Sequence, residues 1–363
     1  MKGKVNDREL NAIVILFTIG TSLLFGAGNV AKEDSWISVI ISTLLMIPIV
    51  KIYCKLLKLY PGKDLFEIFE FISGRWLGKL FVIIYLWFVI HSATLTLFNI
   101  VDFINFVGLP NTPILVIVMC MAILNIWIVK KGIKIIGKWS VFFVFIGMAL
   151  FGGILLLHIP LHNYDNIKPI LSQGYYNIYQ GVISVVGTSF SGLIIFTFFG
   201  EKYSSAENFE KIFIKSVIIA GIIFLIITLE NVLVLGVGNN MRAHFAGYER
   251  LTRVQVGRSF QRLESVISIN FVICEFVRGS IFVLAGAKAV QRLFKLEKYE
   301  FLVIPVVMAS VNLYFIEYQS IMVGVEFLIE SWPYYSITSN ILIPLGILIA
   351  AYIKKYIGTL QTL

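Results

Sequence analysis

Apolar residues lie in ten long runs along the chain, separated by short segments that carry charged residues, glycine, proline or asparagine. A transmembrane helix needs about 20 mostly apolar residues, and each run is near that length. The predicted membrane-spanning helices cover residues 10–30, 36–57, 79–101, 113–130, 138–158, 178–200, 213–236, 265–287, 300–317 and 335–354. The ninth run is the least regular, because Pro305 and Asn312 interrupt it. We therefore expect an all-α integral membrane protein with one transmembrane domain over residues 1–363.

Lysine and arginine lie mostly in alternate segments between these runs. With the amino terminus in the cytoplasm, most of the 30 basic residues fall in inward-facing segments, as the positive-inside rule requires. We therefore expect both chain ends to be cytoplasmic. The composition agrees, since 58% of residues are hydrophobic and 14% are charged, whereas soluble domains carry about 25% charged residues. The net charge of +9 follows from this topology. The basic residues form no continuous patch of the kind that binds nucleic acid.

One outward-facing segment departs from the charge rule. Residues 237–264 carry five arginines, which are Arg242, Arg250, Arg253, Arg258 and Arg262. Long loops late in a chain can carry such charge without changing the topology. The segment is either a solvated surface that touches lipid headgroups, a docking surface for an acidic partner, or a lid over an outward-facing vestibule.

Two of the ten runs are the richest in glycine beside hydroxyl residues, and they are the first run of each half of the chain. The first contains Gly20-Thr21-Ser22, and the sixth contains the stretch from Gly187 to Gly192. Glycine lowers helix stability by about 1 kcal/mol relative to alanine, and Ser or Thr hydroxyls can take over backbone partners. Irregular backbone at membrane depth is tolerated where it lines a cavity or is buried in protein. Close helix packing through small residues is the alternative interpretation.

Matching breaks in the two halves are typical of transporters built as inverted repeats. We therefore predict a 5+5 inverted repeat of the leucine-transporter type, with broken first and sixth helices. The first repeat covers about residues 10–158 and the second about 178–354. Helix ends exposed at a break offer N–H groups to a carboxylate, so a small zwitterion such as an amino acid could bind there. The residues expected to hold it are Gly20, Thr21, Ser22, Gly187, Thr188, Ser189, Phe190, Ser191 and Gly192.

Ionisable residues inside the predicted spans are costly and require a reason. Glu275 and Arg278 are three residues apart and share a helix face, so we expect them to form a charge pair inside the bundle. Glu230 has no basic neighbour in sequence and is either a protonated acid or a cation-coupling group. No nucleophile elbow, P-loop or zinc-protease motif occurs. We expect no catalytic activity, no metal site and no cofactor.

Several short motifs, in this order and spacing, resemble one known family. They are Ile19-Gly20-Thr21-Ser22-Leu23-Leu24, Asp34-Ser35-Trp36, Tyr60-Pro61-Gly62-Lys63-Asp64-Leu65-Phe66-Glu67, Gly74-Arg75-Trp76-Leu77-Gly78-Lys79, Arg262-Leu263-Glu264-Ser265 and Leu293-Phe294-Lys295-Leu296. The chain resembles the B subunits of GerA-type spore germinant receptors, which form the spore-permease branch of the amino acid–polyamine–organocation superfamily. The resemblance extends over nearly the whole chain.

The resemblance implies a ten-helix transporter fold and a germinant-sensing role in the inner membrane of a bacterial spore. It also implies two partners, an A subunit with membrane and cytoplasmic parts and a C subunit lipoprotein on the outer side. By position, Gly20 and Thr21 fall in the unwound part of the first helix, and Thr188 to Gly192 fall in that of the sixth. Family members often place a proline and a carboxylate in the sixth-helix stretch, where this chain has Ser189-Phe190-Ser191-Gly192.

Three functions fit these observations. The chain is a receptor subunit that binds a small nutrient, a permease that couples amino acid transport to an ion, or a scaffold whose cavity binds nothing. In the permease, Glu230 would be the candidate coupling group. Adjacent genes for A and C subunits would favour the receptor or the scaffold.

Overall fold

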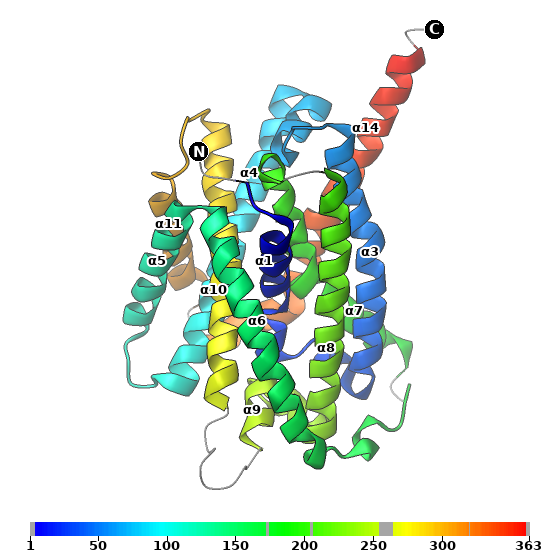
Figure 1. Cartoon of the computed structure of the whole chain (residues 1–363), viewed down its shortest axis with the longest axis vertical. Coiled ribbons are helices and arrows are strands. Elements are labelled where there is room, and N and C mark those ends of the chain that lie inside the picture. Colours follow the sequence, from blue (N-terminus) through cyan, green and yellow to red (C-terminus); the bar gives the residue numbers. More distant parts are fainter. Residues whose placement is uncertain (1–3, 172–173, 204–205, 254–263, 319, 361–363) are drawn as a thin grey trace.

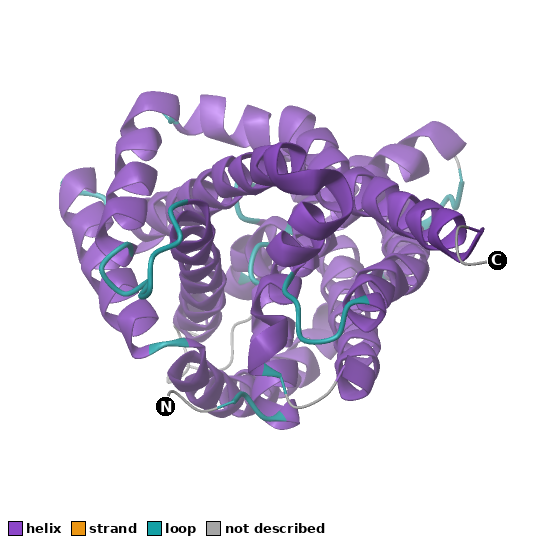
Figure 2. Ribbon diagram, turned by 90° about the horizontal axis from the view of Figure 1, so that it is seen from above, coloured by secondary structure: helices purple, strands orange, loops and turns teal. Residues whose placement is uncertain are grey.

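The computed structural model describes residues 4–171, 174–203, 206–253, 264–318 and 320–360. Within these residues the chain forms an elongated bundle of helices (Figure 1), and the view along the bundle shows helices throughout its cross-section, with no strand drawn (Figure 2). The only β-type pairing in this part of the chain is an isolated bridge between Val5 and Tyr203. Both ends of the described chain lie at the same end of the bundle. The all-α prediction is confirmed.

The helices follow one another with short connections. The α-helices are α1 (Asp7–Ile19), α2 (Ser22–Phe25), α3 (Ser35–Leu59), α4 (Leu65–Phe103), α5 (Ile114–Lys131), α6 (Ile133–His158), α7 (Tyr175–Val185), α8 (Ala206–Arg242), α9 (Ala246–Thr252), α10 (Glu264–Leu293), α11 (Val303–Glu317), α12 (Ile321–Glu326), α13 (Trp332–Ile337) and α14 (Ile343–Leu360). The 3₁₀ and π segments are η1 (Asn29–Asp34), η2 (Ile104–Gly108), η3 (Ile159–Leu161), η4 (Tyr164–Ile167), η5 (Val186–Phe190), η6 (Ser191–Lys202), η7 (Phe327–Ser331) and η8 (Thr338–Leu342).

Eight of the described helical segments are long and apolar enough to cross a membrane. They are Asn29–Leu59, Leu65–Gly108, Ile114–Lys131, Ile133–Leu161, Tyr175–Gly200, Asn208–Arg242, Ser268–Leu293 and Ile321–Lys354. The other two predicted spans correspond to shorter helices, the 13-residue α1 and the 15-residue apolar α11. The last span begins well before the expected residue 335, because α12 to α14 continue through Glu326 and Glu330 by way of two π segments. Ten crossings therefore remain a prediction.

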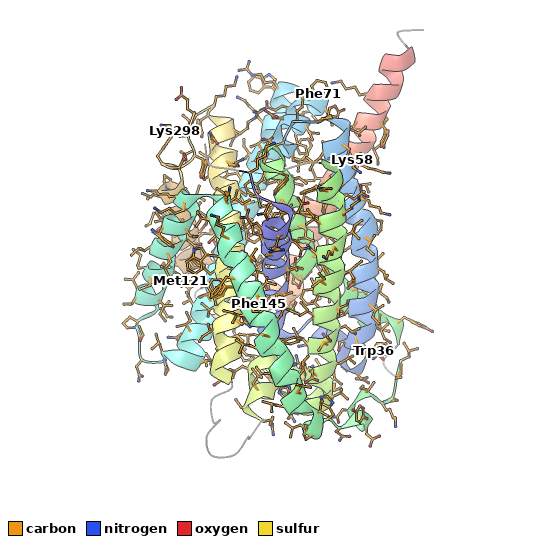
Figure 3. The ribbon with its side chains drawn as sticks, viewed as in Figure 1. Trp36, Lys58, Phe71, Met121, Phe145 and Lys298 are labelled. Carbon is orange, nitrogen blue, oxygen red and sulfur yellow. The ribbon has the colours of Figure 1, made fainter. Side chains whose placement is uncertain are left out.

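Two lysines that the charge rule assigns to the same side lie at the same end of the bundle. Lys58 and Lys298 lie at the end of the bundle that also holds both chain ends, while Trp36 lies near the opposite end (Figure 3). A capping box stabilises the start of α1 at this end, since the Asn6 side chain accepts from the Glu9 N–H and the Glu9 carboxylate accepts from the Asn6 N–H. The arrangement agrees with a chain that crosses back and forth and returns to its starting side.

The predicted breaks in the first and sixth helices take different forms. α1 ends at Ile19, two residues separate it from the single turn of α2, and the chain then turns through Gly26 and Gly28, which adopt positive φ angles of 76° and 69°. The sixth helix remains helical but changes type. It passes from the α-helix α7 into the π segment η5, and then into the 12-residue 3₁₀ segment η6. Such changes of helical type disturb the regular hydrogen-bond ladder and often mark functional positions.

The predicted outer segment 237–264 is only partly a loop. α8 continues to Arg242, and α9 covers Ala246–Thr252. Arg250 on α9 is buried, 1% exposed, and donates to the Ile227 carbonyl at 3.3 Å. Arg258 and Arg262 lie outside the described residues. At least one of the five arginines therefore has a structural role within the bundle.

Candidate functional site

The charge pair predicted on the eighth span is buried inside the bundle. Glu275 and Arg278 both belong to α10, and the Arg278 Nη1 atom lies 3.8 Å from the Glu275 Oε1 atom. Glu275 is fully buried and Arg278 is 5% exposed. The guanidinium also lies over the rings of Phe17 and Phe282, at 5.5 and 5.9 Å from their centroids, within the range of cation–π attraction.

The break in the first helix brings its backbone and hydroxyl groups against this pair. The Thr21 hydroxyl donates to Glu275 Oε1 at 2.9 Å and accepts from Arg278 Nη1. Gly20 allows the approach, because a Cβ atom at this position would lie 2.6 Å from the Glu275 Oε1 atom. Gly20 and Thr21 therefore allow the interrupted first helix to lie in close contact with the buried Glu275 carboxylate.

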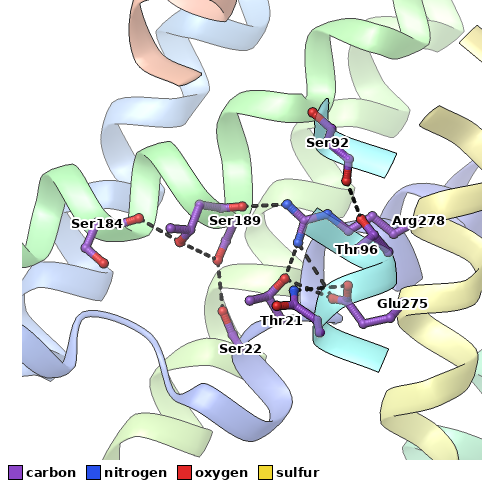
Figure 4. A network of polar contacts seen from close by, with 10 residues as sticks. Thr21, Ser22, Ser92, Thr96, Ser184, Ser189, Glu275 and Arg278 are labelled. Atoms are coloured by element: carbon purple, nitrogen blue, oxygen red, sulfur yellow. Dashed lines mark hydrogen bonds and ion pairs between the residues drawn. The ribbon is translucent and has the colours of Figure 1, made fainter. Parts of the chain in front are cut away.

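The irregular sixth helix supplies the other side of the site. Arg278 Nη2 donates to the backbone carbonyl of Thr188 at 2.6 Å, where η5 has lost the α-helical pattern. The Ser22 and Ser189 hydroxyls lie 2.9 Å apart and join the first helix directly to the sixth. Figure 4 shows Arg278 extending from α10 to both helices. One buried guanidinium thus connects the interrupted first helix and the irregular sixth helix.

A small cavity lies beside the guanidinium. Its lining comes from five parts of the chain and consists of Thr21, Ser92, Leu95, Thr96, Asn99, Thr188, Arg278, Phe282, Leu328 and Trp332. Its volume is about 10 Å³, close to the space that one water molecule needs. Asn99 Nδ2 donates to Glu275 Oε2 at 3.4 Å. Within the described part of the chain, Asn99 Oδ1 and Arg278 Nε are buried without a hydrogen-bond partner. One acceptor and one donor on residues that line the cavity are therefore unsatisfied.

The nine residues expected to bind a ligand divide into two groups. Thr21 and Thr188 line the cavity, Gly20 contacts the charge pair, and the two serines, Ser22 and Ser189, hydrogen-bond to each other beside it. The remaining residues of the sixth-helix stretch have packing contacts, which are Gly187 against Pro333, the Phe190 ring against Phe224 at 5.2 Å, the Ser191 hydroxyl against Ser336 at 2.5 Å and Gly192 against Phe17. The broken-helix interpretation therefore describes the residues beside the cavity, and the close-packing interpretation describes the others.

Glu230, which sequence reasoning left without a partner, has two. His158 Nδ1 lies 2.9 Å from Glu230 Oε2, and His162 Nε2 lies 2.9 Å from Oε1. Glu230 is 6% exposed and His158 is fully buried. None of the three lines the cavity beside Arg278. The cluster ties the end of α6 and the following 3₁₀ turn to α8.

Sequence reasoning missed the contributions of α4 and of the last span. Ser92, Thr96 and Asn99 recur at intervals of four and three residues, which places them on one face of a helix. A polar stripe inside an apolar span is a signal that could have pointed to them. Trp332 gave no such signal, because an aromatic residue near a membrane span has many other uses.

These features define a class of protein. Long apolar helices, two irregular helices that meet at a buried charge pair and a polar cavity at their junction are typical of multi-pass membrane proteins with a transporter fold. The structure is similar to two crystal structures of a manganese transporter of Eremococcus coleocola, each of a different point mutant, with TM-scores of 0.65 and 0.64. Each match has 11% sequence identity and covers 96% of this chain and 78% of the transporter. The transporter fold is confirmed.

The chain belongs to the spore germination protein (spore permease) family, whose model matches residues 4–321. It is similar to spore germination protein KB of Bacillus subtilis (strain 168), with 24% identity over 298 residues, 81% of this chain and 80% of that protein. It is also similar to spore germination protein YndE of the same organism, with 23% identity over 304 residues, 80% of this chain and 82% of that protein. The resemblance seen in the short motifs is confirmed.

Proposed function

We propose that the chain is the germinant-sensing membrane subunit of a spore nutrient receptor and that it binds a small nutrient beside Arg278. The observation that carries the proposal is the buried guanidinium, which donates both to the Thr21 hydroxyl and to the Thr188 carbonyl. A ligand that competes for these contacts would change how the first and sixth helices are held together. Binding and helix movement are therefore coupled at one side chain.

The polar groups around the cavity favour a zwitterion such as an amino acid. Arg278 Nε can donate to a carboxylate. Asn99 Oδ1 can accept from an ammonium group. Trp332, Phe282 and Leu328 provide apolar surface for a side chain. A few polar groups that fix orientation, together with apolar surface, are the usual composition of a small-molecule site.

The size of the cavity implies that binding requires a rearrangement. About 10 Å³ holds a water molecule at most, whereas small-molecule sites are usually hundreds of Å³. The nutrient would therefore favour a second conformation in which the two irregular helices separate. A ligand shifts such an equilibrium only by its differential affinity for the two states, and breaking the Arg278 contacts supplies such a difference.

The signal would pass to an A subunit and to a C subunit lipoprotein in the inner membrane of the spore, with both chain ends of this subunit in the cytoplasm. Family membership and the position of both chain ends at one end of the bundle support this arrangement. Helix α9 and the end of α8 lie near the opposite end (Figure 1), where the exposed Arg242 and Arg253 would meet a partner on the outer side.

Germination of spores against nutrient concentration tests the site. Thr188→Leu places a bulky side chain in the cavity lining, and Gly20→Ala forces the Glu275 carboxylate to move. Both variants should shift the dose response to higher nutrient concentration at unchanged protein level. Thr338→Leu is the matched control, because Thr338 is exposed and, like Thr188, donates to the carbonyl four residues before it. An unchanged response in both variants would overturn the site assignment.

An ion-coupled amino acid permease is the second candidate, favoured by the likeness of the fold to a transporter. Glu230 would be the coupling group and would exchange its proton with His158 or His162. Purified protein in vesicles should then accumulate labelled amino acid under a proton or Na⁺ gradient. Binding without accumulation would favour the receptor.

A further inference from the structure

A large groove opens on the side of the bundle, away from the site beside Arg278. It lies between the first turns of α1, the middle of α6 and the first turns of α8, and has a volume of about 800 Å³. Its lining residues are Asp7, Arg8, Asn11, Ala12, Val141, Val144, Phe145, Met148, Ala149, Lys211, Ile212, Lys215 and Ile219. None of the residues that line the small cavity beside Arg278 lines this groove.

The walls of the groove form an apolar stripe on a lipid-facing helix. The α6 residues Val141, Val144, Phe145, Met148 and Ala149 follow helical spacing and lie on one face. Only 17% of the apolar window of this span is buried within the chain, and Phe145 is 78% exposed and lies midway along the bundle (Figure 3). The stripe is about 12 Å long at 1.5 Å per residue, most of one leaflet of a hydrocarbon core about 30 Å thick.

The mouth of the groove is basic. Arg8, Lys211 and Lys215 line it at the end of the bundle that holds both chain ends, and all three are exposed. Among the described residues none of the three forms an ion pair. The one acid in the lining, Asp7, accepts a hydrogen bond from Asn208 at 3.1 Å. The groove therefore combines a positively charged mouth with an apolar interior.

We propose that the groove binds an anionic membrane phospholipid, with its phosphate at Arg8, Lys211 and Lys215 and one acyl chain along the α6 stripe. Lysine and arginine near a membrane surface attract anionic headgroups, by about five-fold in affinity for each residue. The groove is charged at its mouth and apolar further in, just as a phospholipid is charged at its headgroup and apolar along its acyl chains. The competing occupant is an amphipathic helix of a partner subunit. Its carboxylates would have to be confined to the first turn, because only the mouth of the groove is basic.

A photoreactive lipid tests the assignment on the full chain reconstituted in nanodiscs of phosphatidylcholine. The probe is phosphatidylglycerol with a diazirine on its acyl chain, and the comparison probe is phosphatidylcholine with the same group. Mass spectrometry of the digested protein gives the labelled residues. The test variant is Lys211→Gln with Lys215→Gln. The matched control is Lys51→Gln with Lys55→Gln, an exposed pair at the same spacing on α3 and outside the groove.

The phosphatidylglycerol probe should label residues 141–149 and 212–219 more strongly than the phosphatidylcholine probe. The yield should fall about five-fold or more in the Lys211 and Lys215 variant and stay unchanged in the control, with identical elution of all three proteins on size exclusion. Equal labelling by the two probes, or labelling that is insensitive to the lysines, would overturn the proposal. Loss of the labelling when the partner subunits are added would assign the groove to a protein partner instead.

Discussion

Removing the Arg278 charge should destabilise the protein strongly, because its partner is fully buried. In Arg278→Met, Glu275 keeps its contacts with Thr21 and Asn99 but loses the compensating cation 3.8 Å away. Breaking a buried pair by removing one partner costs about 3–5 kcal/mol. The free energy of unfolding should fall by that amount. Titration of the purified protein with a denaturing detergent, followed by circular dichroism, measures it.

A second variant separates the effect of the lost charge pair from the effect of the lost side-chain packing. Arg278→Met combined with Glu275→Gln removes both charges, so most of the lost stability should return. Lys58→Met is the surface control, since Lys58 and Glu210 form an exposed pair at 2.5 Å and such pairs contribute at most about 1 kcal/mol. If the double variant is as unstable as Arg278→Met alone, the two charges do not stabilise each other and the reasoning is wrong.

Two further predictions concern packing and the second buried carboxylate. Gly187→Ala should lower the unfolding midpoint clearly, because a Cβ atom there would overlap the backbone of Pro333, while Gly152→Ala should not, because no atom lies within 4 Å. Glu230→Gln should also lower the midpoint, because it replaces a buried carboxylate that lies 2.9 Å from both His158 and His162. Thermal unfolding in one detergent measures the midpoint of each variant. A Gly187→Ala or Glu230→Gln midpoint equal to that of the unmodified chain would contradict the corresponding prediction.

Much of the fold could be read from the sequence because bilayer thickness sets the length of each apolar run. The interruption at Gly20-Thr21 was also visible, because glycine lowers helix stability and a Ser or Thr hydroxyl can take over backbone partners. The form of the sixth-helix irregularity was not. Nothing in Gly187 to Gly192 distinguishes an unwound segment from a π turn followed by a 3₁₀ helix, because that choice depends on packing against α13.

The partners of the buried charges could be found only in part. Glu275 and Arg278 share a helix face, so the three-residue spacing was sufficient. Glu230 lies 68 residues from His162, and no helical period connects groups on separate helices. The same holds for Arg278 and the Thr188 carbonyl, 90 residues apart. Pairings across helices depend on the tertiary arrangement, which hydrophobic periodicity does not contain.

Direct binding to the purified chain tests the proposed nutrient site most directly. Isothermal titration with a panel of amino acids should show saturable binding of at least one. Thr188→Leu should weaken that affinity by about ten-fold or more, which corresponds to about 1.4 kcal/mol, and Thr338→Leu should leave it unchanged. The absence of saturable binding to the chain, alone and with its partner subunits, would contradict the account, and so would equal affinities in the two variants.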